Sequence, residues 1–213
     1  MKKYVVDENF FANIDTENKA YWLGFLYADG YQDGYEIIIR LKVDDKEHLE
    51  KLKLDLNSSH PIRNTKEIGY FTKKLKIMSN LRIGSKKICN QLSVLGCVKA
   101  KSCIIRLPNL PEYLVRHFVR GYFDGDGSIS KSGRGIDAVL YSGSVNFIDD
   151  IEKLFHNEKI GFSRYIDYNN YLRVRRKAEL VKFYNYMYED STVFLDRKHN
   201  KFIEFLGANI LLQ

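Results

Sequence analysis

A nine-residue motif that occurs twice is the feature that most constrains this chain. The first copy, WLGFLYADG, covers residues 22–30, and the second, VRGYFDGDG, covers residues 119–127. Each copy is an apolar run that contains a glycine and ends in a small residue, an aspartate and a glycine. The final aspartates, Asp29 and Asp126, are 97 residues apart (126 − 29), close to half of the 213-residue chain. A motif repeated at half the chain length predicts two related structural units.

Composition narrows the functional class. The chain has 34 Lys and Arg residues against 27 Asp and Glu, which favours a polyanionic partner. Apolar residues make up 45% of the chain, enough for a core in one or two domains. The three cysteines, Cys89, Cys97 and Cys103, have no C-x-x-C spacing, so we expect reduced core thiols in a cytosolic protein and no zinc site. Without a signal-like start or a long apolar run, we expect no membrane span and no secretion.

Secondary-structure signals follow the same order in both halves. In the first half we expect a helix over 16–28 capped by Asp15 or Thr16, a hairpin turn at Asp33-Gly34, a strand over 35–43, a helix over 46–56, a hairpin over 62–78 turning near Gly69, and a helix over 85–95. In the second half we expect a helix over 111–125, strands from 128 and over 138–142, a helix over 145–157, a hairpin over 164–175 turned by Asn169-Asn170, and helices over 178–188 and 197–205. Residues 106–111 hold two of the three prolines. They predict a linker, about 104–111, between repeats 1–105 and 106–213.

Small residues on the two motif helices predict how these helices pack. Gly24 and Ala28 share one helix face, and Gly121 and Gly125 share the equivalent face, which allows two helix backbones to approach closely. The carboxyl ends of the helices would then meet, with two aspartates at the negative ends of two helix dipoles. Such carboxylates repel each other unless a cation is present, and Mg²⁺ suits them. The alternative is that each Asp-Gly only ends a helix and begins a turn.

Both motif copies resemble the LAGLIDADG motif of homing endonucleases, and residues 10–205 resemble a single-chain member with two motifs. The segment FVRGYFDGDGSI, residues 118–129, is especially similar to the intron- and phage-associated branch. Tyr27 departs from the acid that many members have there, at a position that does not bind metal in the family. The resemblance implies an α+β fold of two αββαββα repeats. Their curved antiparallel sheets would form a saddle over DNA, with the motif helices packed at the centre.

The resemblance also implies roles for individual residues. Asp29 and Asp126 would bind divalent metal over the scissile phosphates, with the backbone oxygens of Ala28 and Gly125. The family places a basic residue near each metal. Lys101 and Lys198 each follow their motif aspartate by 72 residues (101 − 29 and 198 − 126). A solvated surface charge is the alternative for each lysine.

Two further polar residues match the family's water-ordering positions. Asp45 and Ser144 follow the long strands, where family members place side chains that order the hydrolytic water. Asp45 is equally suited to cap the helix that follows it.

Basic residues alternate along the expected strands, which places them on one sheet face with apolar residues behind. The candidates for DNA binding are Arg40, Lys42, Lys74, Lys76, Arg173, Arg175 and, across a hairpin, Arg164, with Gln32 and Tyr35 beside the first turn. A basic ribbon of strands fits the DNA major groove. An ordinary solvated sheet face is the alternative.

The resulting prediction is a metal-dependent DNA endonuclease that hydrolyses both strands of a long double-stranded target. The target should be asymmetric because the two halves of the chain differ in sequence. The resemblance implies intron homing, a monomer, Mg²⁺ as cofactor with Mn²⁺ able to replace it, and Ca²⁺ binding without cleavage. It places the protein in the cytoplasm of a bacterial or phage-infected cell or in an organellar matrix. The alternatives are a non-cleaving DNA-binding regulator, an RNA maturase of the same fold, and a repeat protein with accidental Asp-Gly turns.

Overall fold

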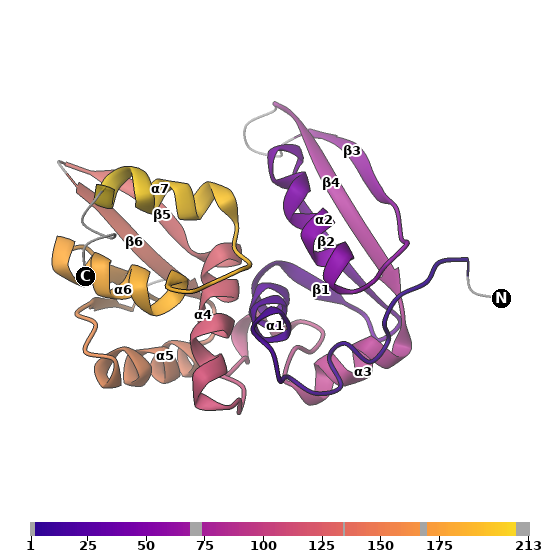
Figure 1. Ribbon diagram of the computed structural model, residues 1–213, viewed down its shortest axis with the longest axis horizontal. Helices are drawn as coiled ribbons and strands as arrows, with labels where there is room; N and C mark the ends of the chain where they lie inside the picture. Colours follow the sequence, from indigo (N-terminus) through magenta and orange to yellow (C-terminus); the bar gives the residue numbers. More distant parts are fainter. Residues whose placement is uncertain (1–2, 69–73, 134, 167–169, 208–213) are drawn as a thin grey trace.

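The computed structural model describes residues 3–68, 74–133, 135–166 and 170–207. This part of the chain is a mixed α+β fold with two four-stranded antiparallel sheets and seven α-helices (Figure 1). The N-terminal half contains α1 (Glu17–Asp29), β1 (Gly30–Gln32), β2 (Glu36–Lys42), the 3-10 turn η1 (Val43–Asp45), α2 (Lys46–Asp55), β3 (Ile62–Ile68), β4 (Leu75–Gly84), α3 (Lys86–Val94) and the 3-10 turn η2 (Lys101–Cys103). The C-terminal half contains α4 (Glu112–Asp126), β5 (Ser128–Ser132), β6 (Gly135–Ser142), α5 (Val145–Asn157), β7 (Ser163–Tyr165), β8 (Asn170–Val174), α6 (Lys177–Tyr188) and α7 (Asp196–Leu206).

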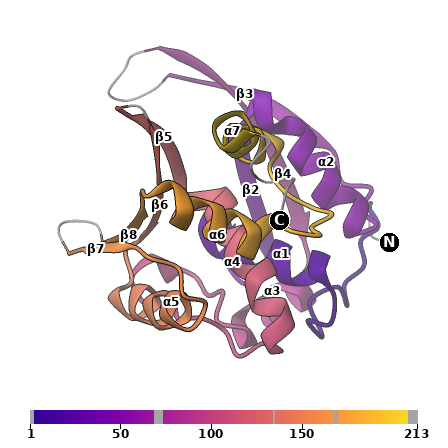
Figure 2. The ribbon, with the colours of Figure 1, turned by 60° about the vertical axis from the view of Figure 1, so that its left-hand side comes forward.

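The two halves repeat one topology. The strand orders are β1-β2-β4-β3 and β5-β6-β8-β7, and every neighbouring pair is antiparallel. Helices α2 and α3 cover one face of the first sheet, and α5, α6 and α7 cover one face of the second (Figures 1 and 2). In β2, Ile37, Ile39 and Leu41 are buried beneath the helices while Arg40 and Lys42 are exposed. Each sheet therefore has a helix-covered inner face and an outer face that carries polar side chains.

Helices α1 and α4 pack against each other at the centre of the molecule (Figure 1). Residues 20–27 of α1 are all buried, because this helix is apolar around its circumference. A Cβ atom on Gly24 would lie 2.0 Å from the carbonyl oxygen of Phe118, and one on Gly121 would lie 1.9 Å from that of Tyr21. A Cβ on Gly125 would lie 2.3 Å from the Cβ of Ala28. The predicted packing of the motif helices through their small residues is confirmed.

Most predicted elements are present with ends shifted by one or two residues. Thr16 caps α1 and Ser85 caps α3 through their side chains, and the hairpin turn contains Gly34 at a φ of 94°. The β3–β4 turn near Gly69 and the residue Asn169 lie outside the described residues. Asn170 is a buried strand residue at the start of β8, so its prediction as a turn residue is wrong.

The three cysteines differ in exposure. Cys89 and Cys97 are buried free thiols, whereas Cys103 is exposed, so the prediction of a core position is wrong for Cys103.

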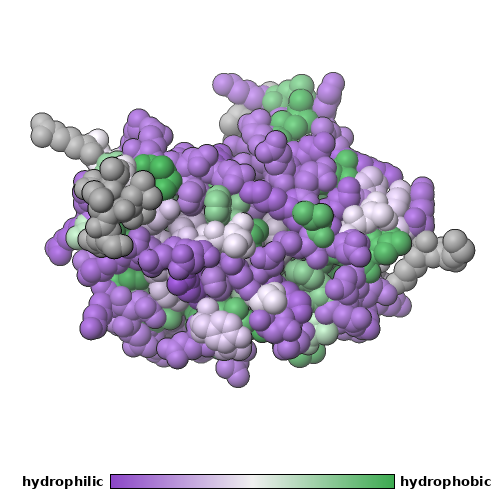
Figure 3. Space-filling view, viewed as in Figure 1, coloured by the Kyte–Doolittle hydropathy of each residue, from purple (hydrophilic) through white to green (hydrophobic). Residues whose placement is uncertain are grey.

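The face of the molecule in Figure 3 is mainly hydrophilic with scattered apolar side chains. Among the described residues, none of the helices combines the length and the apolar character needed to span a membrane.

Candidate active site and nucleic-acid interface

Asp29 and Asp126 are the last residues of α1 and α4. The packing of these helices brings the two carboxylates close enough for the charge of Asp126 to act on Asp29. Both side chains are accessible to solvent. Desolvation by the surrounding protein raises the pKa of Asp29 to about 6, and the negative charge of Asp126 adds to this rise. Desolvation also raises the pKa of Asp126, and the charges of Lys198 and Lys101 oppose it. The site thus holds two accessible carboxylates whose ionised forms are disfavoured by burial and partly stabilised by two lysine charges.

The donor set of this site fits a hard cation that keeps most of its waters. The described residues contain no group of three or more His, Cys, Asp or Glu side chains that could hold a metal. Two carboxylates would therefore be completed by backbone oxygens and water, which is the usual manner of Mg²⁺ binding. Gly125 O already accepts a hydrogen bond from Lys198 Nζ at 3.0 Å, so a cation on this oxygen would share it with an ammonium group.

Lys101 and Lys198 occupy equivalent positions beside the motif aspartates. Lys101 Nζ donates to the carbonyl of Gly30, and Lys198 Nζ donates to that of Gly127. These glycines directly follow the two motif aspartates, so the matched spacing of 72 residues reflects matched positions. The side chains are 9% and 4% exposed, and the alternative of solvated surface lysines is therefore wrong.

Lys198 is more constrained than Lys101. Its Nζ also donates to Phe123 O at 2.6 Å, so the ammonium group binds carbonyls at the negative end of the α4 dipole. Burial lowers the pKa of Lys198 to about 8, and the charge of Asp124 opposes this shift. The two halves of the site therefore differ electrostatically although their lysines correspond.

Asp45 and Ser144 have different surroundings from those predicted. The Asp45 carboxylate makes no capping hydrogen bond to α2; it accepts from Arg197 Nε and Nη2, each at 3.1 Å. Asp45 occupies the N-cap position of α2, as the helix-cap alternative expects, but its carboxylate does not cap the helix, and its negative charge contributes to the raised pKa of Asp29. Ser144 is fully buried, donates to Ile105 O at 2.6 Å and caps α5. These structural partners give its hydroxyl a role in the fold and lend no support to the predicted water-ordering role, which stays a prediction.

Sequence reasoning missed a buried polar cluster between the two halves. Asp124 is 1% exposed and accepts hydrogen bonds from Tyr21 Oη at 2.9 Å, Tyr188 Oη at 2.6 Å and Leu195 N at 2.8 Å. Burial raises the pKa of Asp124. The three donors come from α1, α6 and the α6–α7 connection (residues 189–195). The signal that could have revealed this cluster is a second acid inside an apolar motif.

Arg120 extends the same cluster. This fully buried side chain pairs with Glu17 of α1 at 2.6 Å and donates to Val193 O and Met187 O. The α6–α7 connection is thereby joined to both motif helices. As with Asp124, the available signal was a charged residue in an apolar helix.

The outer face of the first sheet is basic. Arg40, Lys42 and Lys76 are exposed on it as predicted, and Lys74 is exposed just before β4. Arg40 is paired with Glu67 at 3.0 Å and Asn80 at 2.7 Å. Strand register places two further arginines on this face, Arg63 opposite Asn80 and Arg82 opposite Ile38. Sequence alternation missed these two arginines, which line a hollow of about 370 Å³ with Arg40.

On the second sheet, Arg173 and Arg175 lie on the outer face, both within 4 Å of Asp137. Arg164 does not join them: it lies opposite Leu172, a core residue, and pairs with Asp149 and Glu152 of α5. Its predicted position on the outer face with the other basic residues is therefore wrong.

The two residues predicted beside the first hairpin turn differ from each other. Gln32 is 5% exposed and donates to Ser93 Oγ and Cys97 O, both at 2.9 Å, so it is a buried structural residue and its predicted base contact gains no support. Tyr35 is 64% exposed, with Lys86 Nζ 4.6 Å from its ring centroid.

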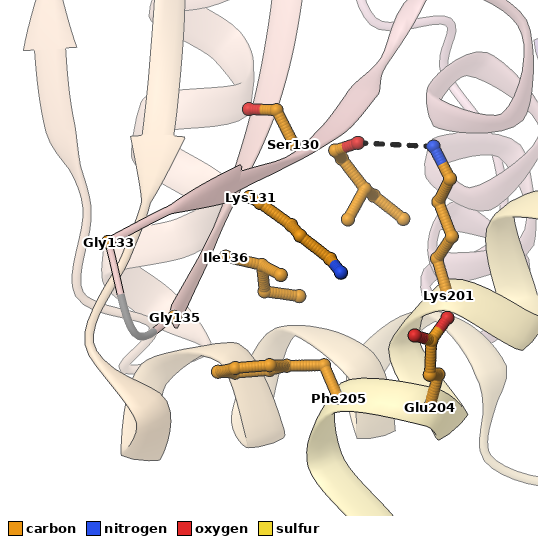
Figure 4. Close-up of a pocket in the computed structure, with 9 residues that line it drawn as sticks. Ser130, Lys131, Gly133, Gly135, Ile136, Lys201, Glu204 and Phe205 are labelled. Carbon is orange, nitrogen blue, oxygen red and sulfur yellow. Dashed lines mark hydrogen bonds between the residues drawn. The ribbon is translucent and has the colours of Figure 1, made fainter.

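A separate cavity of about 630 Å³ lies between the β5–β6 hairpin and α7 (Figure 4). Ile136 and Phe205 form part of its wall, and Lys201 Nζ donates to Ile129 O at 3.4 Å. The cavity is lined by none of the motif aspartates or the two buried lysines. It has no part in the candidate site.

Parts of this chain are similar in sequence to known proteins. Residues 114–188 match the family described as LAGLIDADG-like domain. A probable translation initiation factor IF-2 of Methanocaldococcus jannaschii is 27% identical over 166 residues, covering 73% of this chain. The matched region is only 13% of that protein's length.

Solved structures similar to this chain include DNA-bound nucleases. The homing endonuclease I-WcaI bound to its DNA recognition sequence has a TM-score of 0.66 and 12% identity, with 90% of this chain and 91% of that chain covered. The LAGLIDADG meganuclease I-CpaMI bound to uncleaved DNA has a TM-score of 0.58 and 14% identity, with 92% of each chain covered. The N-terminal LAGLIDADG domain of DUF199/WhiA has a TM-score of 0.55 and 14% identity, with 92% and 93% covered. Residues 114–188 thus match the LAGLIDADG-like domain family, and the chain as a whole has the fold of LAGLIDADG homing endonucleases.

Proposed function

We propose that this protein is a site-specific endonuclease that cleaves both strands of a long asymmetric DNA duplex by metal-dependent hydrolysis. The observation that carries the proposal is the pair of accessible aspartates, Asp29 and Asp126, which end the two packed helices α1 and α4 and whose pKa values are both raised by burial. The buried lysines beside them and the DNA-bound relatives of the same fold support it.

In this proposal the two aspartates hold Mg²⁺ with the backbone oxygens of Ala28 and Gly125, and Mn²⁺ can replace it. The ion would supply Lewis-acid activation of water and of the scissile phosphate. Lys101 and Lys198 place positive charge beside each aspartate, where it can stabilise the phosphate charge that develops during hydrolysis. Asp45, hydrogen-bonded to Arg197, would orient water near Asp29, and its electrostatic effect on Asp29 supports this role.

The DNA would lie across the outer faces of both sheets, which together form the predicted saddle. Repeats 1–105 and 106–213 would each contact one half of the target, and one chain would act as a monomer. The repeated strand order of the two sheets supports this division.

The decisive test uses a duplex enriched from a randomised DNA library by binding in Ca²⁺, which should permit binding without cleavage. Asp29→Asn and Asp126→Asn should each abolish double-strand cleavage in Mg²⁺ while target binding persists. Asp44→Asn, at an exposed acid in η1, is the matched control and should cut normally. Normal double-strand cleavage by either motif variant would disprove the assignment.

A non-cleaving DNA-binding regulator is the second candidate. The similarity to the WhiA domain favours it, because that protein shares the fold and its name specifies no nuclease. Duplex binding without Mg²⁺- or Mn²⁺-dependent cleavage of the enriched target would favour this candidate.

A further inference from the structure

The outer faces of the two sheets differ in chemistry. On the described strands, the face of the first sheet carries five basic and two acidic side chains, which are Arg40, Lys42, Arg63, Lys76, Arg82, Glu36 and Glu67. Asn80 and Thr65 lie among them and are joined by a hydrogen bond of 2.9 Å. This face can both neutralise phosphates and form hydrogen bonds with base edges.

The outer face of the second sheet instead carries a tyrosine ladder, formed by Tyr141, Tyr171 and Tyr165. Tyr171 lies directly opposite Tyr141 on β6 and Tyr165 on β7, so the three rings cross the sheet in one row. The ring centroids of Tyr141 and Tyr171 are 5.3 Å apart. Those of Tyr165 and Tyr171 are 4.7 Å apart, with the rings stacked at 14°. Tyr165 is 38% exposed, and Tyr141 and Tyr171 are half-buried, so the ladder is a partly solvent-accessible aromatic surface on this face.

Positive charge on this second face is held close to the sheet. The Arg173 guanidinium lies 4.7 Å from the ring centroid of Tyr165 and 5.6 Å from that of Tyr171. Arg173 and Arg175 share one carboxylate, that of Asp137, at 3.7 and 3.4 Å. The other outward positions on the strands of this sheet are serines, Gly135 and Val139. This face therefore offers fewer basic side chains to guanine edges than the first, two against five.

We propose that the second sheet recognises a thymine-rich half of the DNA target through contacts between the tyrosine ladder and thymine 5-methyl groups. The proposal rests on the proposed DNA-binding function. The major groove presents one apolar group that distinguishes bases, the thymine methyl, and apolar side chains contact it. The first sheet would read the other half-site by hydrogen bonds from its arginines, lysines and Asn80. The two half-sites would thus be recognised by different chemistry.

The test replaces thymine by deoxyuridine, which removes only the methyl group. The probe is the duplex enriched from a randomised library in Ca²⁺, and repeating the enrichment with Tyr171→Ala identifies the half-site that the ladder reads. Deoxyuridine in that half-site should weaken binding about fourfold for each contacted methyl, the expected effect of losing one buried methyl-sized group. The same replacement in the other half-site should leave affinity unchanged.

Two variants separate the ring from its hydroxyl. Tyr171→Phe should keep the difference between thymine and deoxyuridine, whereas Tyr171→Ala should remove it, with thermal melts confirming that both variants fold. Equal binding of thymine and deoxyuridine duplexes by the wild type would overturn the inference while leaving the endonuclease proposal intact. Enrichment of no duplex would overturn both. Preferential binding of single-stranded RNA through stacking on the ladder would also overturn the thymine assignment.

Discussion

At the scale of single residues, the two buried lysines are the side chains on which cleavage should depend most sharply after the aspartates. Lys101→Met and Lys198→Met should each slow single-turnover cleavage at saturating Mg²⁺ by roughly 10²-fold, the effect of losing one charged donor to the transition state. Lys198→Met should also lower the melting temperature, because it leaves the carbonyls of Phe123, Gly125 and Gly127 without their ammonium donor.

Lys201→Met is the matched control for this prediction. Lys201 lies on the same helix as Lys198, α7, at an exposed position. The Lys201→Met variant should cut at the wild-type rate. Unchanged rates for Lys101→Met and Lys198→Met would assign both lysines a structural role only.

The raised pKa of Asp29 predicts the pH dependence of metal binding. A cation binds the ionised carboxylate, so protons compete with it below the pKa of about 6. Ca²⁺ affinity should be nearly constant above pH 7 and fall about tenfold per pH unit below pH 6, and more steeply if Asp126 is also protonated. Calorimetric titration between pH 5 and 7.5 measures this. An affinity unchanged from pH 7 to pH 5 would show that Asp29 does not bind the ion.

The residues that sequence predicted well are those whose position depends on a local motif. Asp29 and Asp126 end predictable helices. The equal sequence spacing from them to Lys101 and Lys198 corresponds to equivalent positions in the folded structure. Gln32 and Arg164 were misplaced because a short strand does not reveal which face its side chains take. The face of Arg164 depends on its register with Leu172, and no sequence signal sets that register.

At the scale of elements, the contact between α1 and α4 makes a strong prediction about glycine. Gly121→Ala should destabilise the protein by about 2 kcal/mol or more, because its Cβ would lie 1.9 Å from a backbone oxygen and the helices must separate. Gly24→Leu or Gly121→Leu should prevent stable folding altogether. Thermal and urea unfolding measure these effects.

Gly84→Ala provides the comparison for these glycine variants. No atom lies within 4 Å of a Cβ built on Gly84, so this variant should unfold like the wild type. A Gly121→Leu protein that melted normally and cut DNA would disprove close helix packing at this glycine.

The order of helices and strands was predictable because each half has strong local signals, such as the capping residues Thr16 and Ser85. The conformation of the α6–α7 connection was not predictable from the sequence. Its backbone is fixed by Asp124, Arg120 and Glu17, which are distant in sequence from residues 189–195. Such contacts follow from tertiary packing and have no periodic signature.

At the scale of the whole molecule, DNA affinity should fall steeply with salt, and the first sheet should account for most of the dependence. Neutralising Z phosphates gives a log–log slope of about −0.9Z. Of the predicted basic candidates Arg40, Lys42, Lys74, Lys76, Arg173 and Arg175, each that contacts only phosphate should reduce the slope by about 1 when changed to Ala.

Salt titration in Ca²⁺ on the enriched and a scrambled duplex tests this prediction. Arg164→Ala, on the helix-covered side of the second sheet, should leave the slope unchanged. A slope unaffected by all six alanine variants would mean that DNA does not bind across the sheets.

The whole fold was predictable mainly because the motif occurs twice, and one packed pair of helices then organises two similar sheets. The chemical difference between the outer faces of the two sheets was harder to predict from the sequence. The row of three tyrosines depends on strand pairing across β6, β8 and β7, which only the folded structure reveals.

The position of α1 has a consequence for how the protein folds as it is synthesised. Helix α1 is buried on all sides, yet its main partner, α4, begins almost one hundred residues later. At typical translation rates α1 would await that partner for roughly 5–20 seconds. During this time the side of α1 that faces α4, including Tyr21 and Tyr27, lacks its native cover. Nascent chains that stall before residue 112 should therefore be substrates for chaperones, and completion of the second half should release them.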